Sequence, residues 1–196
     1  MPRATPSHWQ RRGLLAWVLL PLAALFAFVA TLRRMAYRLG WLAVERLPVP
    51  VLVVGNIAVG GSGKTPVVLW LVDALRGAGF HPGIVSRGYG GSQSGAALVP
   101  PEGEAARYGD EPILLARLAG CPVAVGADRP AAGRCLLAAH PECDVIVSDD
   151  GLQHYRLGRD LEIVVVDQAV LGNGLPLPAG PLREGLARLA EADLMI

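Results

Sequence analysis

A glycine-rich segment followed by lysine and threonine is the part of this 196-residue chain with the clearest chemistry. Ala58 to Thr65 fits the phosphate-binding loop pattern, with alanine in place of the usual first glycine. Lys64 adds a positive charge for the β- and γ-phosphates of a nucleotide, and the hydroxyl of Thr65 is a ligand for Mg²⁺. The backbone N–H groups of the loop converge on phosphate oxygens because its glycines have no Cβ. The central residues are Gly60, Gly61, Ser62 and Gly63. We therefore predict a site for ATP and Mg²⁺.

Two adjacent carboxylates follow an apolar segment later in the chain. Residues 145–148 are predicted to form a buried strand, and Asp149 and Asp150 come directly after it. In proteins with a phosphate-binding loop, an aspartate at such a strand end holds Mg²⁺, directly or through water. Adjacent side chains of a strand point in opposite directions, so only one of the two need face the metal. A polar turn is the alternative interpretation.

Other polar residues stand at similar positions. Asp110 and Glu111 precede a predicted helix, and the pattern alone favours helix capping by Asp110 over catalysis. Arg87 and Tyr89 follow a predicted strand within a glycine-rich loop, where Arg87 could contact a phosphate and Tyr89 a substrate, or the arginine is solvated. His154 lies shortly after the acidic pair, and for a lone histidine a structural role is the commoner interpretation.

The sequence after Pro48 predicts the scaffold that positions these residues. Short apolar segments alternate with helical stretches, which is typical of a parallel sheet covered by helices on both faces. We predict an α/β fold of the P-loop NTPase type over residues 48–196, with ligands bound at the carboxyl ends of the strands. The predicted strands are 49–55, 83–86, 122–125, 145–148 and 162–166, and the predicted helices are 66–76, 112–119 and 131–140. Residues 192–196 resemble the start of another strand, so we expect that a C-terminal part is missing.

Residues 1–47 form a separate N-terminal segment that we predict to associate with a membrane. Residues 14–30 are an unbroken apolar run which, as a helix, reaches about 26 Å, slightly short of a hydrocarbon core of roughly 30 Å. Beyond it, apolar residues recur at helical spacing from Leu32 to Ala43, mostly opposite Arg33, Arg34 and Arg38, as in a basic amphipathic helix on an anionic membrane. A signal peptide and a buried core helix are the alternatives, but no convincing cleavage site follows.

The composition argues against several other function classes. The chain has 18 Lys and Arg against 17 Asp and Glu, a net charge of +1, so there is no electrostatic case for nucleic acid as the main partner. Cys121, Cys135 and Cys143 have no C-x-x-C spacing, so they indicate neither a disulfide framework nor a zinc site. We expect three buried thiols in a reducing compartment.

Several of the segments described above, with others listed here, resemble those of a known family, the tetraacyldisaccharide 4'-kinases of lipid A biosynthesis. The matching segments run in order and cover about residues 14–196. They are VGN at 54–56 with VGGSGKTP at 59–66, SRGYG at 86–90, GDEP at 109–112, SDDGLQH at 148–154, GNG at 172–174 and PAGPLRE at 178–184. The last three segments in this order are far more specific than a phosphate-binding loop.

The resemblance implies transfer of the γ-phosphate of ATP to the 4'-hydroxyl of a lipid A disaccharide 1-phosphate, at the cytoplasmic face of the bacterial inner membrane. By motif, Lys64 and Thr65 serve the phosphates and Mg²⁺, and Asp149 and Asp150 serve the metal site. Asp110 becomes the general base that takes the proton of the sugar hydroxyl. The residues implied to line the catalytic cleft are Arg87, Tyr89, Glu111 and His154. In the family a histidine from the C-terminal part pairs with the base, and no residue of this chain matches it.

Two other function classes compete with this one. A membrane-recruited ATPase of the partitioning or metal-targeting type usually has a second lysine just before the double glycine, where this chain has Val59. A nucleotide-dependent binding module would bind ATP without transferring phosphate.

Overall fold

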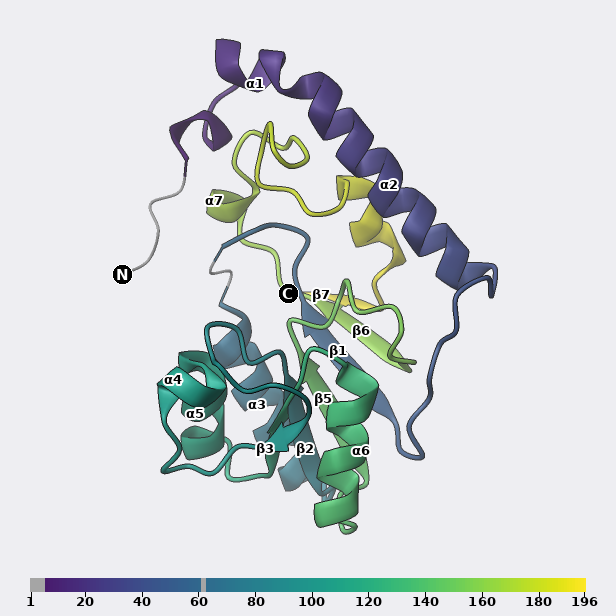
Figure 1. Ribbon diagram of the computed structural model, residues 1–196, viewed down its shortest axis with the longest axis vertical. Coiled ribbons are helices and arrows are strands. Elements are labelled where there is room, and N and C mark those ends of the chain that lie inside the picture. The colour runs from purple at the N-terminus through teal and green to yellow at the C-terminus, as the bar shows by residue number, and fades with distance from the viewer. Residues whose placement is uncertain (1–5, 61–62) are drawn as a thin grey trace.

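One sheet organises the part of the chain that follows residue 48 (Figure 1). A computed structural model describes residues 6–60 and 63–196, and within them seven strands form the order β3-β4-β2-β5-β1-β6-β7. All neighbouring pairs are parallel except β3 and β4, which are antiparallel. The strands are β1 (Val51–Gly55), β2 (Pro82–Ser86), β3 (Ala97–Leu98), β4 (Val123–Val125), β5 (Val145–Asp149), β6 (Leu161–Val164) and β7 (Leu194–Met195). The predicted α/β fold is confirmed, strand ends differ from the prediction by at most two residues, and only the two-residue β3 was not predicted.

Helices cover both faces of the sheet. The helices of this part are α3 (Lys64–Gly77), α4 (Ala105–Tyr108), α5 (Asp110–Leu118), α6 (Arg129–Ala139), α7 (Gln168–Leu171) and the 3-10 helix η2 (Leu186–Glu191). Val54 and Ile84 are buried with side chains of α3 and α5, whereas their neighbours Val53 and Val85 are buried with α6. This alternation follows from the two-residue repeat of a strand, and it explains why the strands are apolar throughout.

The start of α5 corrects the prediction that Asp110 caps this helix. The capping residue is Gly109, with φ 92°, and Asp110 is the first helical residue and makes no capping hydrogen bond. A Cβ on Gly109 would lie 2.5 Å from the carbonyl oxygen of Tyr89. Glycine is therefore required where the loop after β2 touches the start of α5. The carboxylate of Asp110 is exposed, so capping does not occupy it.

The N-terminal arm, residues 7–38, consists of η1 (Ser7–Trp9), α1 (Leu14–Val18) and α2 (Leu20–Arg38). The apolar run is thus two helices and not one. The predicted amphipathic helix also ends earlier than Ala43, because Gly40 adopts φ 74° and the chain turns there. Only Ala23 of α2 is buried, which argues against a core helix. In the described part of the chain, α2 alone is long and apolar enough to cross a membrane, a test that signal sequences also pass.

The three cysteines are free thiols, but only Cys143 is buried. Cys121 and Cys135 are half-buried, so the expectation of three buried thiols is wrong for two of them. Burial raises the pKa of Cys121 to about 12, which keeps it a thiol at neutral pH.

Candidate active site

The phosphate-binding loop lies at the carboxyl end of β1, in the middle of the sheet. Gly60 has φ 138° and Gly63 has φ 73°, conformations that side chains rarely allow. Helix α3 begins at Lys64, so its N-terminus, which favours anions, stands at the end of the loop. Gly61 and Ser62 lie outside the described residues.

Lys64 and Thr65 connect this loop to two other segments. The ammonium of Lys64, whose side chain is 9% exposed, lies 3.6 Å from Asp150 Oδ1. The hydroxyl of Thr65 donates a hydrogen bond of 2.8 Å to Glu111 Oε1. The loop, the acidic pair after β5 and the start of α5 therefore meet at one place, with Asp110 next to Glu111 in the chain.

Asp149 is the buried member of the acidic pair. It has no exposed surface, and its Oδ2 accepts a hydrogen bond of 3.2 Å from the hydroxyl of Ser86. Among the described residues its Oδ1 has no hydrogen-bond partner. Burial, with the negative charges of Glu111 and Asp150, raises the pKa of Asp149 to about 7. A buried carboxylate oxygen without a partner suits a bound cation.

Asp150 is in a different situation, although it is the next residue. It has φ 46°, and Arg183 Nη1 donates to both of its carboxylate oxygens, at 3.2 and 3.1 Å. Burial disfavours its ionised form, but Arg183 and Lys64 outweigh burial and lower the pKa of Asp150. Asp150 is therefore an anion held between two cations, and it is less available to a metal than Asp149.

A pocket of about 430 Å³ opens beside Asp150. Its polar lining includes Arg87, His154 and Arg183, and its opposite wall is α2, which contributes Phe26 and Val29. Burial, with the charges of Arg129 and Arg87, lowers the pKa of His154 to about 4, so its imidazole is neutral at pH 7. The structure thus brings two predicted cleft residues, Arg87 and His154, to one pocket. Tyr89 does not line it and is 81% exposed.

Comparison with known proteins shows the family of the chain. A family model described as tetraacyldisaccharide-1-P 4'-kinase (LpxK) matches residues 15–196. The chain belongs to this family. Tetraacyldisaccharide 4'-kinases of Aromatoleum aromaticum and Azoarcus sp. are each 65% identical to it over all 196 residues, which cover 58% and 57% of their lengths. LpxK from Aquifex aeolicus, crystallised in complex with ATP, is 37% identical with a TM-score of 0.85, over 93% of this chain and 58% of that one. The chain therefore spans less than two thirds of these relatives.

Three residues of the candidate site had no role in our sequence interpretation. Arg183 and Ser86 lie within the segments that resemble the family, so the sequence marked their positions, although nothing local connects them to the aspartates. Arg129 lies outside those segments. It is 1% exposed, and its Nη1 and Nη2 donate to the carbonyl oxygens of Gly126 (2.8 Å) and Asp149 (3.1 Å). It therefore supports the backbone that carries the buried aspartate.

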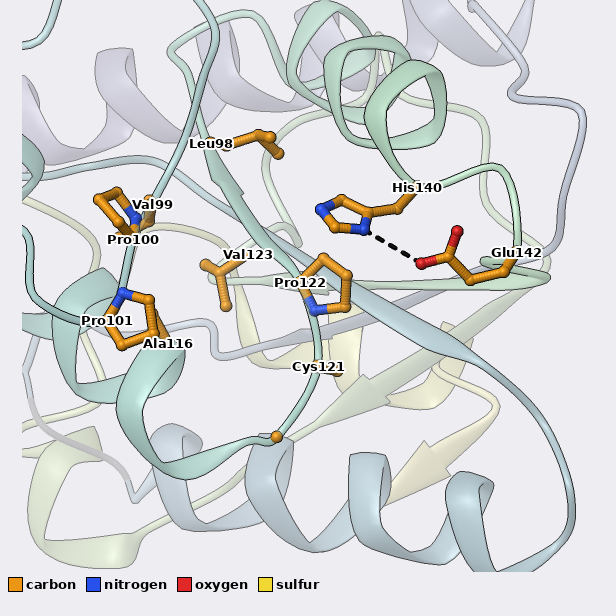
Figure 2. Close-up of a pocket in the computed structure, with 11 residues that line it drawn as sticks. Leu98, Val99, Pro100, Pro101, Ala116, Cys121, Pro122, Val123, His140 and Glu142 are labelled. Carbon is orange, nitrogen blue, oxygen red and sulfur yellow. Dashed lines mark hydrogen bonds and ion pairs between the residues drawn. The ribbon is translucent and has the colours of Figure 1, made fainter.

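A larger pocket, of about 590 Å³, lies away from the phosphate-binding loop (Figure 2). Pro122 and Val123, at the amino end of β4, form part of its lining, and His140 lies to one side with its Nδ1 3.1 Å from Glu142 Oε1. None of the predicted kinase-family site residues lines it. The larger cavity therefore lies at the end of the sheet opposite the phosphate-binding loop.

The residues around the loop offer few ligands for a divalent cation. Within residues 6–60 and 63–196, no group of three or more His, Cys, Asp or Glu side chains could hold a metal ion. A Mg²⁺ ion in phosphoryl transfer needs fewer, because phosphate oxygens, water and a threonine hydroxyl complete its ligands. The partnerless Oδ1 of Asp149 fits this pattern.

Proposed function

We propose that this chain is the nucleotide-binding part of a kinase that transfers the γ-phosphate of ATP to the 4'-hydroxyl of a tetraacyldisaccharide 1-phosphate, a lipid A precursor. The observation that carries the proposal is that Asp150 belongs to two sites at once. It pairs with Lys64 of the phosphate-binding loop, and it lines a pocket whose other wall is the apolar helix α2. An acceptor with a sugar head and acyl chains matches such a pocket, and the names of the relatives specify that acceptor.

The residues around the loop have the properties that phosphoryl transfer requires, which are positioning and charge neutralisation. Lys64 would neutralise the β- and γ-phosphates, and Thr65 and Asp149 would hold Mg²⁺. When bound, Mg²⁺ neutralises charge on the phosphates and orients them. Asp150 would keep Arg183 pointed at the same space, because both of its carboxylate oxygens accept from Arg183 Nη1.

The acceptor hydroxyl needs a base and an orienting partner. We assign the base to Asp110, because its exposed carboxylate stands at the start of α5, beside Glu111, which contacts the loop. His154 is half-buried and neutral at pH 7, so it can hydrogen-bond a sugar hydroxyl without adding a charge. The proposed location is the cytoplasmic face of the bacterial inner membrane, where an anionic lipid surface meets the basic arm.

The decisive experiment uses a protein of the relatives' length, detergent-dispersed lipid A disaccharide 1-phosphate and ATP labelled with ³²P at the γ position. We expect label in the lipid, and no label with the Lys64→Ala variant. Release of labelled phosphate without labelled lipid would favour a membrane-recruited ATPase. Nucleotide binding with neither reaction would favour a binding module, and either outcome would overturn the kinase proposal.

A further inference from the structure

A short loop, residues 173–180, is built around the side chain of one buried asparagine. Asn173, which is 8% exposed, donates through Nδ2 to the carbonyl oxygens of Ala179 and His8, each at 2.9 Å. Its Oδ1 accepts from the backbone N–H of Leu175 at 3.0 Å. The amide therefore uses both of its N–H groups and its oxygen on backbone groups, and none of these bonds goes to a residue of the candidate active site.

The loop is closed tightly around this amide. Gly180 donates to the carbonyl of Pro176 at 2.9 Å, and a Cβ on Gly180 would clash with Oδ1 of Asn173. Beyond the loop, the backbone N–H of Leu182 donates to the carbonyl of Leu175 at 3.1 Å. The position of Leu182 therefore depends on the loop that Asn173 holds together.

The residues after this loop hold the chain that enters the phosphate-binding loop. The two segments, residues 57–59 and 181–183, run antiparallel and are joined at their ends by backbone hydrogen bonds of 2.9 and 2.7 Å. Between these bonds, Ala58 and Leu182 form a bridge and are both buried. The next residue along the chain is Gly60, so these contacts decide where the phosphate-binding loop begins.

Helix α7, which precedes Asn173, touches the same place. A Cβ on Gly60 would lie 3.1 Å from a methyl group of Val170, and Gly174 donates to the carbonyl of Leu171 at 3.0 Å. Val170 and Leu171 also pack against a buried cluster to which both antiparallel segments contribute. The chain therefore supports the entry to the phosphate-binding loop both before and after Asn173.

The beginning of the N-terminal arm closes the other side of the loop. The backbone N–H of Asn173 donates to the carbonyl of Trp9 at 2.7 Å, and the indole of Trp9 donates to the carbonyl of Pro178 at 3.1 Å. A Cβ on Gly172 would clash with that carbonyl of Trp9. Figure 1 shows α7 and the segment after it between the start of the arm and the chain that leaves β1.

We propose that Asn173 is a positioning residue for nucleotide binding. Its amide holds the 173–180 loop, that loop holds residues 181–183, and these residues hold the entry to the phosphate-binding loop at Gly60. Glycines restrain the backbone little, so backbone N–H groups that must point at phosphate need restraint from neighbouring segments. The inference rests on the ATP site of the proposed function and does not depend on the identity of the acceptor.

ATP affinity, measured without any acceptor, tests this role. In a protein of the relatives' length, Asn173→Ala removes all three side-chain hydrogen bonds, and we expect the Kd for ATP with Mg²⁺ to rise about tenfold. Asp160→Ala is the matched control, because Asp160 Oδ2 accepts from the backbone N–H of Val51 at 2.9 Å, at the opposite end of β1. It should change the Kd by less than about twofold. Calorimetric titration measures both.

A second variant separates hydrogen-bond donation from a general loss of packing. Asn173→Asp keeps the shape of the side chain, but the ionised carboxylate cannot donate to Ala179 or His8. A protonated carboxyl regains one donor, and burial among carbonyl oxygens raises the pKa of such a group. The Kd of this variant relative to the unchanged protein should therefore be largest at pH about 8 and should approach one at pH about 5. The ratio for Asn173→Ala should not vary with pH.

Three results would overturn the positioning role. An unchanged Kd for Asn173→Ala would show that the entry to the phosphate-binding loop does not need the amide. An equal rise for Asp160→Ala would show that any loosening of β1 weakens ATP binding. A ratio for Asn173→Asp that is independent of pH would show that the donated bonds are not the cause, and this result decides the matter if Asn173→Ala does not fold. Failure of the kinase proposal would leave all three measurements unaffected, because no lipid is present.

Discussion

Asp149 and Asp150 show how much the surroundings of a residue decide its chemistry. Both are aspartates at the end of β5, yet Asp149 is buried and its Oδ1 has no hydrogen-bond partner among the described residues, whereas Asp150 is held by Arg183 and Lys64. Burial, with nearby carboxylates, raises one pKa, and the two cations lower the other. The pair therefore provides one carboxylate for a cation and one to orient Arg183.

The raised pKa of Asp149 predicts a pH dependence of stability. Because its pKa is about 7 in the folded state and about 4 in the unfolded chain, the folded state binds the extra proton. The free energy of unfolding should therefore fall as the pH rises from about 4 to about 7. Asp149→Asn removes this loss, and we expect it to raise the free energy of unfolding at pH about 8 by on the order of 1 kcal/mol.

Thermal unfolding of this variant at pH about 4 and about 8 measures the effect, with about 2–4 °C expected at the higher pH. Asp73→Asn, at an exposed position on α3, is the matched control. Equal stabilisation at both pH values would contradict the assignment, because it would show that ionisation of Asp149 is not the cause.

Substitutions of Lys64 and Asp110 should impair different steps, the first ATP binding and the second turnover, if their proposed roles hold. In a protein of the relatives' length, Lys64→Ala removes the charge that faces the phosphates, so ATP affinity should fall about tenfold or more. Asp110→Ala should lower kcat by about 10²–10⁴ and change the Kd for ATP by less than about twofold. Direct ATP binding and steady-state kinetics separate the two. Full turnover by Asp110→Ala would remove Asp110 as the base.

At the scale of elements, the carboxyl end of β1 passes very close to the segment that follows the acidic pair. A Cβ on Gly55 would lie 2.6 Å from the Cβ of Leu152 and 3.0 Å from its backbone nitrogen. Glycine at this position therefore allows the two segments to approach each other closely.

A pair of glycine variants tests this contact. Gly55→Ala should lower the free energy of unfolding by about 1–3 kcal/mol, because Leu152 cannot move without its backbone. Gly77→Ala is the control, since Gly77 is the last residue of α3 and a Cβ there meets nothing within 4 Å. It should be neutral or stabilising by up to about 1 kcal/mol. Denaturant unfolding measures both, and similar effects would refute the close-packing argument.

For the whole molecule, one arginine joins three parts of the chain. Arg188 is 3% exposed and pairs with Glu162 on β6, with Glu184 at 3.3 Å and with Glu191 at 3.8 Å. Glu191 in turn holds α2 through its two arginines. The sheet edge, the C-terminal segment and the arm therefore share one network of charges.

Removing this arginine should destabilise the fold more than removing an ordinary surface one. Arg188→Ala leaves the largely buried carboxylate of Glu184 without its ion pair and leaves Glu162 with Arg159 as its remaining one, and we expect a loss of about 3–5 kcal/mol in the free energy of unfolding. Arg46→Ala is the matched control, because its pair with Asp160 has side chains 71% and 48% exposed, and it should cost less than about 1 kcal/mol. Equal losses, measured by denaturant unfolding, would show that Arg188 adds nothing by its burial.

The sequence by itself determined what depends on neighbouring residues. The glycine spacing predicted the phosphate-binding loop, and the alternation of apolar segments with helical ones predicted the parallel sheet. These features depend on repeats of two and 3.6 residues that are visible within a short window. The local sequence also predicted the wrong capping residue for α5. Gly109 caps this helix because of a contact with the distant residue Tyr89, which no short window contains.

Only the tertiary structure decided which charges meet. Arg183 reaches Asp150 across 33 positions, Thr65 reaches Glu111 across 46, and Arg34 reaches Glu191 across 157. Ionisation depends on burial and on partners within a few ångströms, and the folding of the chain sets both. For this reason the sequence could name the acidic pair, but not which member stays ionised, and it could name an apolar arm, but not that both of its ends return to the domain.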